Sequence, residues 1–367
     1  MSSFRVALIS SLMVAAPIAA VHADVEVVVS IKPIHSLVAG VMSGVGSPTL
    51  IVEGNGSPHT YSLKPSHAAK IETADLIFWV GHRLEPFLEK PLESLGAKGR
   101  VVELMDTEGL VHLAFREGGG FEGHDHDHGD HDDHGNTKKG HDDHGPAKDD
   151  DHHAEKHDEH DHEKAKHDDH DREHHAEKHD DHDRGHSDDA HDEDGDDPHI
   201  WLNPLNAKVM VREIARNLAK VDPSNTATYK NNADAMLTQI DSVSAKISAT
   251  LEPVRGRPFI VFHDAYQYFE DRFGLQAAGS ITTSPEVMPG AARIKEMQKR
   301  VRDLGAVCVF SEPQFTPKLI SVVTEGSAAK QGVLDPLGAA LSPGPDLYIT
   351  LIKNIAGSMA TCLSRSS

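Results

Sequence analysis

Several features that would point to other classes of protein are missing from this chain. It contains no glycine-rich phosphate-binding loop of an ATPase and no His-Glu-x-x-His motif of a zinc hydrolase; His162-Glu163 is followed by Lys-Ala-Lys. An excess of basic residues is also lacking. Outside residues 118–197 the chain has 27 acidic and 27 basic residues, so no nucleic acid partner is expected.

One long segment of the chain lacks the side chains that form a hydrophobic core. Between Glu122 and Pro198 there is no Val, Ile, Leu, Met, Phe, Trp, Tyr or Cys, and such a stretch cannot bury a core. The segment 118–197 holds 20 of the 28 histidines, 31 of the 58 acidic residues and 9 of the 36 basic ones, so it carries the whole net charge of −22. We therefore predict a disordered His/Asp-rich insertion at 118–197. Its imidazoles suit weak, multi-site zinc capture, and a solvated loop with incidental affinity is the alternative.

Long apolar runs are also scarce, and the one near the N-terminus is typical of an export signal. Arg5 precedes an apolar run from Val6 to Ala20, and Val21 and Ala23 supply small residues for cleavage. The run is short for a membrane span of about 20 residues. We predict a signal peptide at 1–23 and a periplasmic protein; the alternatives are a buried helix and a membrane anchor. In an oxidising compartment the only two cysteines, Cys308 and Cys362, favour a disulfide over two buried thiols.

Segments of strand and helix character alternate along the rest of the chain. The expected strands are 25–30, 49–52, 74–80, 100–104, 259–262, 275–281, 307–310 and 332–335. The expected helices are 33–40, 66–73 with Ser66 as N-cap, 84–95, 206–221, 224–251, 265–273, 290–303, 317–330 and 346–363. This order predicts an α/β fold with two (β/α) sandwich lobes and largely parallel sheets. The lobes are 24–221 and 254–367, joined by a rigid helix within 222–253 that spans roughly 40 Å.

Three histidines lie where a strand or a glycine-rich segment gives way to a loop: His59, His199 and His263. Asp335 follows Val333-Leu334 in the same manner. Ligands of open parallel sheets bind beyond the carboxyl ends of the strands. Three imidazoles with one carboxylate or water form a four-coordinate set that suits zinc. Position alone is a weak indication, since a loop histidine is more often a surface or capping residue.

Four further histidines lie outside the signal and the insertion: His35, His67, His82 and His112. We interpret them as structural or surface residues. His67 is expected on an exposed helix turn. His82, which follows a strand, is the best placed of the four to act as an accessory ligand.

The motifs around these residues resemble one family, the zinc-binding subunits of bacterial zinc uptake ABC transporters (cluster A-I, or cluster 9, solute-binding proteins). The matching segments are Ser57-Pro58-His59-Thr60-Tyr61-Ser62-Leu63-Lys64-Pro65-Ser66, Ala74-Asp75-Leu76-Ile77-Phe78-Trp79-Val80-Gly81, Asp197-Pro198-His199-Ile200-Trp201-Leu202-Asn203-Pro204, Phe262-His263-Asp264-Ala265-Tyr266, Ser311-Glu312-Pro313-Gln314-Phe315 and Leu334-Asp335-Pro336-Leu337-Gly338. They occur in order from about Val25 to Leu363, interrupted by the insertion.

The resemblance implies a set of site residues. His59, His199 and His263 match the family's metal ligands, and Asp335 matches its fourth ligand position, which water fills in some zinc members. Manganese-binding relatives carry a glutamate where this chain has His263, so that position favours zinc. Glu312 is suited to orient a ligand or to serve the fold. Cys308 and Cys362 match a disulfide of the zinc subgroup.

The resemblance also implies a function. The protein is expected to capture Zn²⁺ as cargo in the periplasm and pass it to an inner-membrane permease that is driven by a separate cytoplasmic ATPase. It is expected to be a monomer and not an enzyme. A metal buffer or adhesin-like zinc/manganese-binding protein is the alternative, and a zinc hydrolase is a third hypothesis.

Overall fold

The computed structural model describes residues 25–94, 99–116, 120–121, 195–282, 285, 288–315 and 318–364. The predicted signal peptide at 1–23 and residues 122–194 of the predicted insertion lie outside the described residues. Residues 120–121 and 195–197, which we placed inside the insertion, belong to the described fold.

The first lobe is built on a four-stranded parallel sheet of order β2-β1-β3-β4. Its elements are β1 (Val27–Val29), α1 (Lys32–Val41), β2 (Thr49–Leu50), α2 (Pro65–Thr73), β3 (Leu76–Trp79), α3 (Pro86–Ser94), β4 (Arg100–Glu103), the 3-10 turn η1 (Ile200–Leu202) and α4 (Pro204–Val221). The two central strands are apolar and buried along their whole length. Runs of this kind are typical of parallel strands covered on both faces.

The second lobe repeats this pattern with a parallel sheet of order β6-β5-β7-β8. Its elements are β5 (Phe259–His263), α6 (Gln267–Phe273), β6 (Gly279–Thr282), α7 (Ala291–Asp303), β7 (Cys308–Ser311), α8 (Lys318–Thr324), β8 (Lys330–Val333) and α9 (Leu347–Leu363). A disulfide joins Cys308 of β7 to Cys362 of α9, which confirms the predicted bridge. The expectation of two α/β lobes with parallel sheets is also confirmed.

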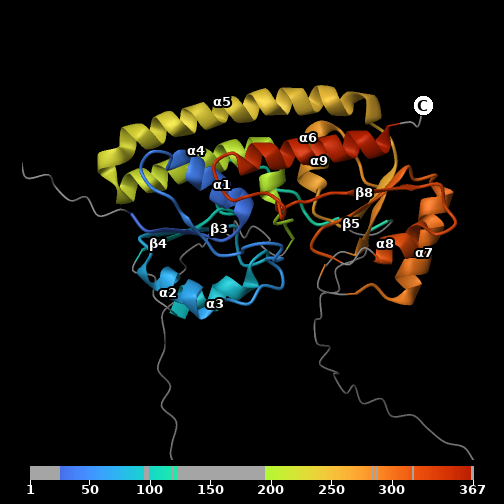
Figure 1. The fold of residues 1–367 in the computed structure, drawn as a ribbon, viewed down its shortest axis with the longest axis horizontal. Helices are drawn as coiled ribbons and strands as arrows, with labels where there is room; N and C mark the ends of the chain where they lie inside the picture. Colours follow the sequence, from blue (N-terminus) through green and yellow to red (C-terminus); the bar gives the residue numbers. More distant parts are fainter. Residues whose placement is uncertain are drawn as a thin grey trace, which may run out of the picture. The chain divides into compact units, whose positions relative to one another are not determined.

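A long helix, α5 (Thr226–Leu251), connects the two lobes, flanked by the 3-10 turns η2 (Pro223–Asn225) and η3 (Glu252–Val254). Its 26 residues span about 39 Å. Tyr229, Met236 and Ile240 belong to the buried stripe along one of its faces, and α5 packs on α4 and α9. Figure 1 shows α5 running over both lobes, with α9 beneath it. Within the described part of the chain, no helix is long and apolar enough to cross a membrane.

Several predicted boundaries were wrong for local reasons. Helix α2 begins at Pro65 with Lys64 as N-cap and no side-chain cap, so Ser66 does not cap it. Proline favours the first helical position because its φ is already helical and its missing N–H has no partner there. Helix α8 ends at Thr324 rather than near Lys330, since the chain turns at Gly326 with φ of 69°. Strand β6 begins at Gly279, later than predicted.

Candidate metal centre

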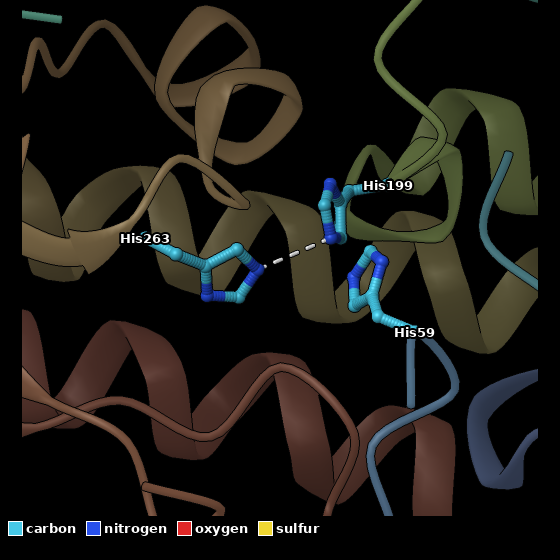
Figure 2. A group of neighbouring side chains, drawn as sticks. All are labelled: His59, His199 and His263. Atoms are coloured by element: carbon cyan, nitrogen blue, oxygen red, sulfur yellow. Dashed lines mark hydrogen bonds between the residues drawn. The ribbon is translucent and has the colours of Figure 1, made fainter. Parts of the chain in front are cut away.

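Three histidines from distant parts of the chain converge between the two sheet units. His59 lies in the loop between β2 and α2, His199 directly precedes η1, and His263 is the last residue of β5. Each offers one ring nitrogen, and these atoms all lie within 4.8 Å of one another. Figure 2 shows the three rings turned toward a common point. His59 belongs to the first lobe and His263 to the second, so both lobes contribute to this one group.

The local chain explains the placement of each ring. His263 is the last residue of a buried parallel strand, and ligands of open parallel sheets bind beyond the carboxyl ends of the strands. The backbone N–H of His199 donates to Asp197 Oδ1 at 3.0 Å, which forms a tight turn before the 3-10 helix. His59 follows a turn in which Gly54 adopts a positive φ of 64°. His199 and His263 are buried, whereas His59 is half-buried.

Two buried carboxylates each contact the Nδ1 atom of one of the rings. Asp197 Oδ1 lies 2.6 Å from His199 Nδ1, and Glu312 Oε1 lies 2.7 Å from His263 Nδ1. When an Nδ1–H donates to a carboxylate, the lone pair is on Nε2, and that nitrogen becomes the metal-binding atom. The two Nε2 atoms lie 3.3 Å apart. Nitrogens bound to one tetrahedral zinc at about 2.0–2.1 Å would be separated by roughly 3.4 Å, so these two fit a shared ion.

Burial sets the protonation of the cluster. The pKa of His59 and that of His199 are well below the ordinary value, because of burial first and then the positive charge of the neighbouring imidazoles. The pKa of His263 is raised, since the charge and hydrogen bond of Glu312 outweigh the effect of burial. Two of the three imidazoles are therefore neutral at neutral pH, which is the form that binds a metal.

The surroundings of the cluster are mostly apolar. Leu84, Trp201, Phe315, Pro336 and Leu337 line the small pocket around the three rings, together with Glu312 and Gln314. An apolar shell limits access of solvent and strengthens the electrostatic interactions inside it. The arrangement offers three imidazole ligands, which suit zinc better than cations that prefer oxygen.

The structure does not bring Asp335 into this group. One of its carboxylate oxygens accepts backbone N–H bonds from Leu337 and Gly338 at 3.2 and 2.9 Å, and the other accepts from Ala339 at 2.6 Å. Gln314 Nε2 donates to the same side chain at 3.2 Å. In this conformation Asp335 organises the loop after β8.

The remaining histidines also lie apart from the cluster. The expectation for His67 was wrong: it is only 8% exposed and stacks on Tyr61, whose ring centroid is 6.4 Å away. His82 is not part of the three-histidine group, and its Nδ1 lies 3.5 Å from Glu103 Oε1. His35 is buried against Pro48 O, and His112 pairs with Asp196 at the surface, as a structural or surface role requires.

Two functional neighbours escaped the sequence analysis. The role of Asp197 was not predicted, although an acidic residue two positions before a histidine is a detectable signal. Arg116 was not singled out. It forms ion pairs with Asp264 and Glu270 beside the cluster, and no local pattern identifies such a distant partner.

Two α/β lobes joined by a long helix, with three histidines that could hold a metal ion meeting between the lobes, are typical of metal-binding solute-binding proteins. The family described as "Zinc-uptake complex component A periplasmic" matches residues 27–362. The chain belongs to this family.

Similar proteins agree with this assignment. The chain is 52% identical over 339 residues to the high-affinity zinc uptake system protein ZnuA of Brucella suis, covering 92% of each chain. It is 37% identical over 360 residues to the protein of the same description from Paracoccus denitrificans, covering 96% of this chain and 98% of the relative. In fold it is similar to the periplasmic zinc binding protein TroA from Treponema pallidum, with a TM-score of 0.66, 16% identity and coverage of 94% and 100%.

Proposed function

We propose that the protein captures Zn²⁺ in the periplasm and delivers it to an inner-membrane ABC permease. His59, His199 and His263 are the ligands. The observation that carries this proposal is the convergence of three imidazole nitrogens from two lobes, two of them oriented by buried carboxylates. The relatives at 52% and 37% identity bear the description of high-affinity zinc uptake proteins.

The fourth coordination position is filled by water while Asp335 keeps its bonds to the backbone. An ion held by three neutral imidazoles retains its 2+ charge, so its release to a permease does not require the removal of a charged carboxylate ligand. Zinc is the transported ligand and has no catalytic role, so the protein is not an enzyme. The protein works as a monomer. The ATPase that drives the permease is a separate chain, because this sequence contains no phosphate-binding loop.

The test is a zinc titration of variants in a background that lacks residues 122–194, because that segment contains 20 other histidines. The parent protein should bind one zinc ion tightly. His59→Ala, His199→Ala and His263→Ala should each lose that tight site. His82→Ala is the matched control, since His82 pairs with Glu103 away from the cluster.

Retention of the tight site in all three histidine variants would contradict the proposal. Hydrolytic turnover of an ester or peptide substrate by the zinc-loaded parent, absent from the three variants, would indicate an enzyme instead. The deletion itself is informative: loss of the tightest site on removing residues 122–194 would place that site in the insertion.

A further inference from the structure

A short antiparallel pairing closes the base of the insertion. The backbone N–H of Phe115 donates to Gly195 O at 2.7 Å, and that of Asp197 donates to Leu113 O at 2.8 Å. Ala114 and Asp196 form the β-bridge between these two bonds. We call residues 113–116 and 195–197 the stem. The stem ends two residues before His199, so one of its strands leads directly into the metal centre.

Arg116 extends the stem into the second lobe. Its Nε donates to Asp264 at 3.0 Å and its Nη2 donates to the other oxygen of the same carboxylate. Its Nη1 and Nη2 donate to the two oxygens of Glu270 at 2.7 and 3.1 Å. The Arg116 side chain is 17% exposed, and the carboxylates of Asp264 and Glu270 are 7% and 3% exposed. A planar guanidinium can hold two carboxylates in this way, whereas an ammonium group cannot.

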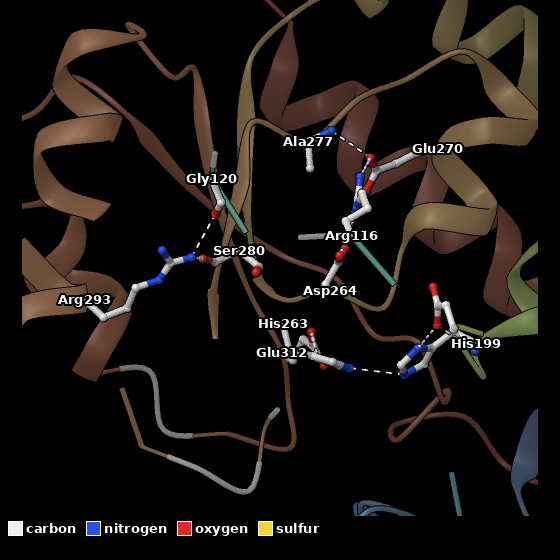
Figure 3. A network of polar contacts seen from close by, with 11 residues as sticks. Arg116, Gly120, His199, His263, Asp264, Glu270, Ala277, Ser280, Arg293 and Glu312 are labelled. Carbon is white, nitrogen blue, oxygen red and sulfur yellow. Dashed lines mark hydrogen bonds and ion pairs between the residues drawn. The ribbon is translucent and has the colours of Figure 1, made fainter. Parts of the chain in front are cut away.

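This network touches the residues beside two of the three histidines (Figure 3). Asp264 follows His263 directly in the chain, so Arg116 fixes the backbone that carries that ring. The positive charge of Arg116 also acts on Asp197, the carboxylate that orients His199. Glu270 receives a further bond from Ala277 N at 2.7 Å, which anchors the network in the second lobe.

We propose that Arg116 is a positioning residue of the metal centre: by clamping Asp264 and Glu270 from the stem, it holds His263 at the separation from His199 that zinc requires. This inference rests on the proposed function. If Arg116 only neutralised the charges of Asp264 and Glu270, any nearby cation would be sufficient. The doubly bidentate geometry starts from the stem, which also contains Asp197, so it ties the chain before His199 to the chain that follows His263.

The test compares Arg116→Lys with Arg293→Lys in the full-length protein, loaded with one equivalent of Zn²⁺ or Co²⁺ so that the tight site fills before the 20 histidines of residues 122–194. Arg293 is the matched control because it is also a buried arginine of the same region. Its guanidinium donates to Gly120 O and Ser280 O at 2.8 and 2.7 Å and does not contact the carboxylates beside His263. The measurements are the rate of zinc dissociation into a chelator, the visible spectrum of the Co²⁺-substituted protein, and the thermal unfolding of the metal-free protein.

Arg116→Lys should fold and release zinc about tenfold faster or more. Its Co²⁺ absorption bands should shift, since the ligand geometry has changed. Arg293→Lys should keep both properties of the parent whatever its thermal stability. A purely structural role of Arg116 would lower thermal stability without moving the cobalt spectrum, and that result would overturn the inference.

A second variant covers the case in which Arg116→Lys fails to fold. The combination Arg116→Met with Asp264→Asn and Glu270→Gln removes the three charges together and leaves no buried charge unpaired. It should also release zinc faster with an altered cobalt spectrum, and parent values of both would overturn the inference. If the parent binds zinc tightly and the Arg116 variants match it in zinc release and cobalt spectrum, only this inference is refuted. If the parent has no tight zinc site, the proposed function is refuted as well.

Discussion

Glu312 Oε1 lies 2.7 Å from Nδ1 of His263, and the opposite nitrogen of that ring faces His199. The carboxylate therefore selects the tautomer in which Nε2 carries the lone pair. Burial lowers the pKa of His263, but the charge and hydrogen bond of Glu312 outweigh it, so the pKa of this ring is raised. A residue outside the direct ligand set thus decides which atom of His263 is available.

The first prediction concerns this carboxylate. Glu312→Gln should weaken zinc binding by about 10–100-fold, because an amide is a poorer acceptor and can donate to Nδ1 in the wrong tautomer. Competition with a chelator of known affinity measures the change. Glu296→Gln is the control: Glu296 pairs with Arg293 at the surface, where its side chain is 49% exposed. Equal affinities for the two variants would refute the orienting role of Glu312.

The second prediction separates a ligand from a loop anchor. Asp335→Ala removes an acceptor of three backbone N–H groups, so the free energy of unfolding should fall by about 1–3 kcal/mol. The zinc affinity should stay close to that of the parent, because Asp335 is not in the three-histidine group. Chemical denaturation and zinc competition measure the two quantities on the same sample. A large loss of affinity with unchanged stability would show that Asp335 binds the ion.

The third prediction is a dependence of stability on pH. Burial raises the pKa of Glu85 to about 7, although Val80 N and Gly81 N donate to its carboxylate. The folded protein therefore holds this proton more tightly than the unfolded chain. The contribution to stability is complete below the unfolded pKa near 4.5 and is lost as pH rises to about 7.

Glu85→Gln should remove this loss, because the amide stays neutral and its oxygen can accept the same two bonds. At pH 8 the variant should be more stable than the parent by at most about 3 kcal/mol, and near pH 4 the two should be equally stable. Denaturant unfolding across this range measures the difference. Glu89→Gln, at an exposed position on α3, should follow the parent at every pH.

The fourth prediction concerns the disulfide. Cys308 and Cys362 are 54 positions apart, so replacing both with serine should cost roughly 4 kcal/mol in the chain-entropy model. The bridge pins α9 to β7, away from the three histidines, so zinc stoichiometry should not change. Thermal unfolding and zinc titration of the double variant test both statements. A loss of stoichiometric binding in a folded variant would contradict the separation of these two parts.

Much of the fold could be predicted because its signals are local. Strands β1 and β3, and β5 up to Phe262, are continuous runs of apolar residues, and α5 is a long helical pattern, so consecutive residues are enough to predict them. The boundaries of α2 and α8 were harder, because one proline and one glycine decided them. The three histidines could be predicted only with the family motifs, since loop position alone does not separate His59 from His82.

The parts that could not be predicted depend on distant contacts. Asp335 matches the family's ligand position, yet its carboxylate is held by the loop that follows it. His67 lies on a polar helix and was expected to be exposed, but Tyr61 covers it. Arg116 is separated from Asp264 by 148 positions, and no periodicity in the sequence relates them.

Gly120 and Phe121 have a consequence for the design of truncated variants. Ser280 N donates to Gly120 O at 3.2 Å, so residue 120 covers part of the β6 edge of the second sheet. Uncovered edge strands invite pairing with other chains and aggregation. A truncation meant to remove the histidine-rich segment should therefore start after Phe121 and stop before Gly195. A longer deletion that removed Gly120 would expose the edge of β6 to pairing with other chains and lower the yield of soluble protein, even if the zinc site were intact.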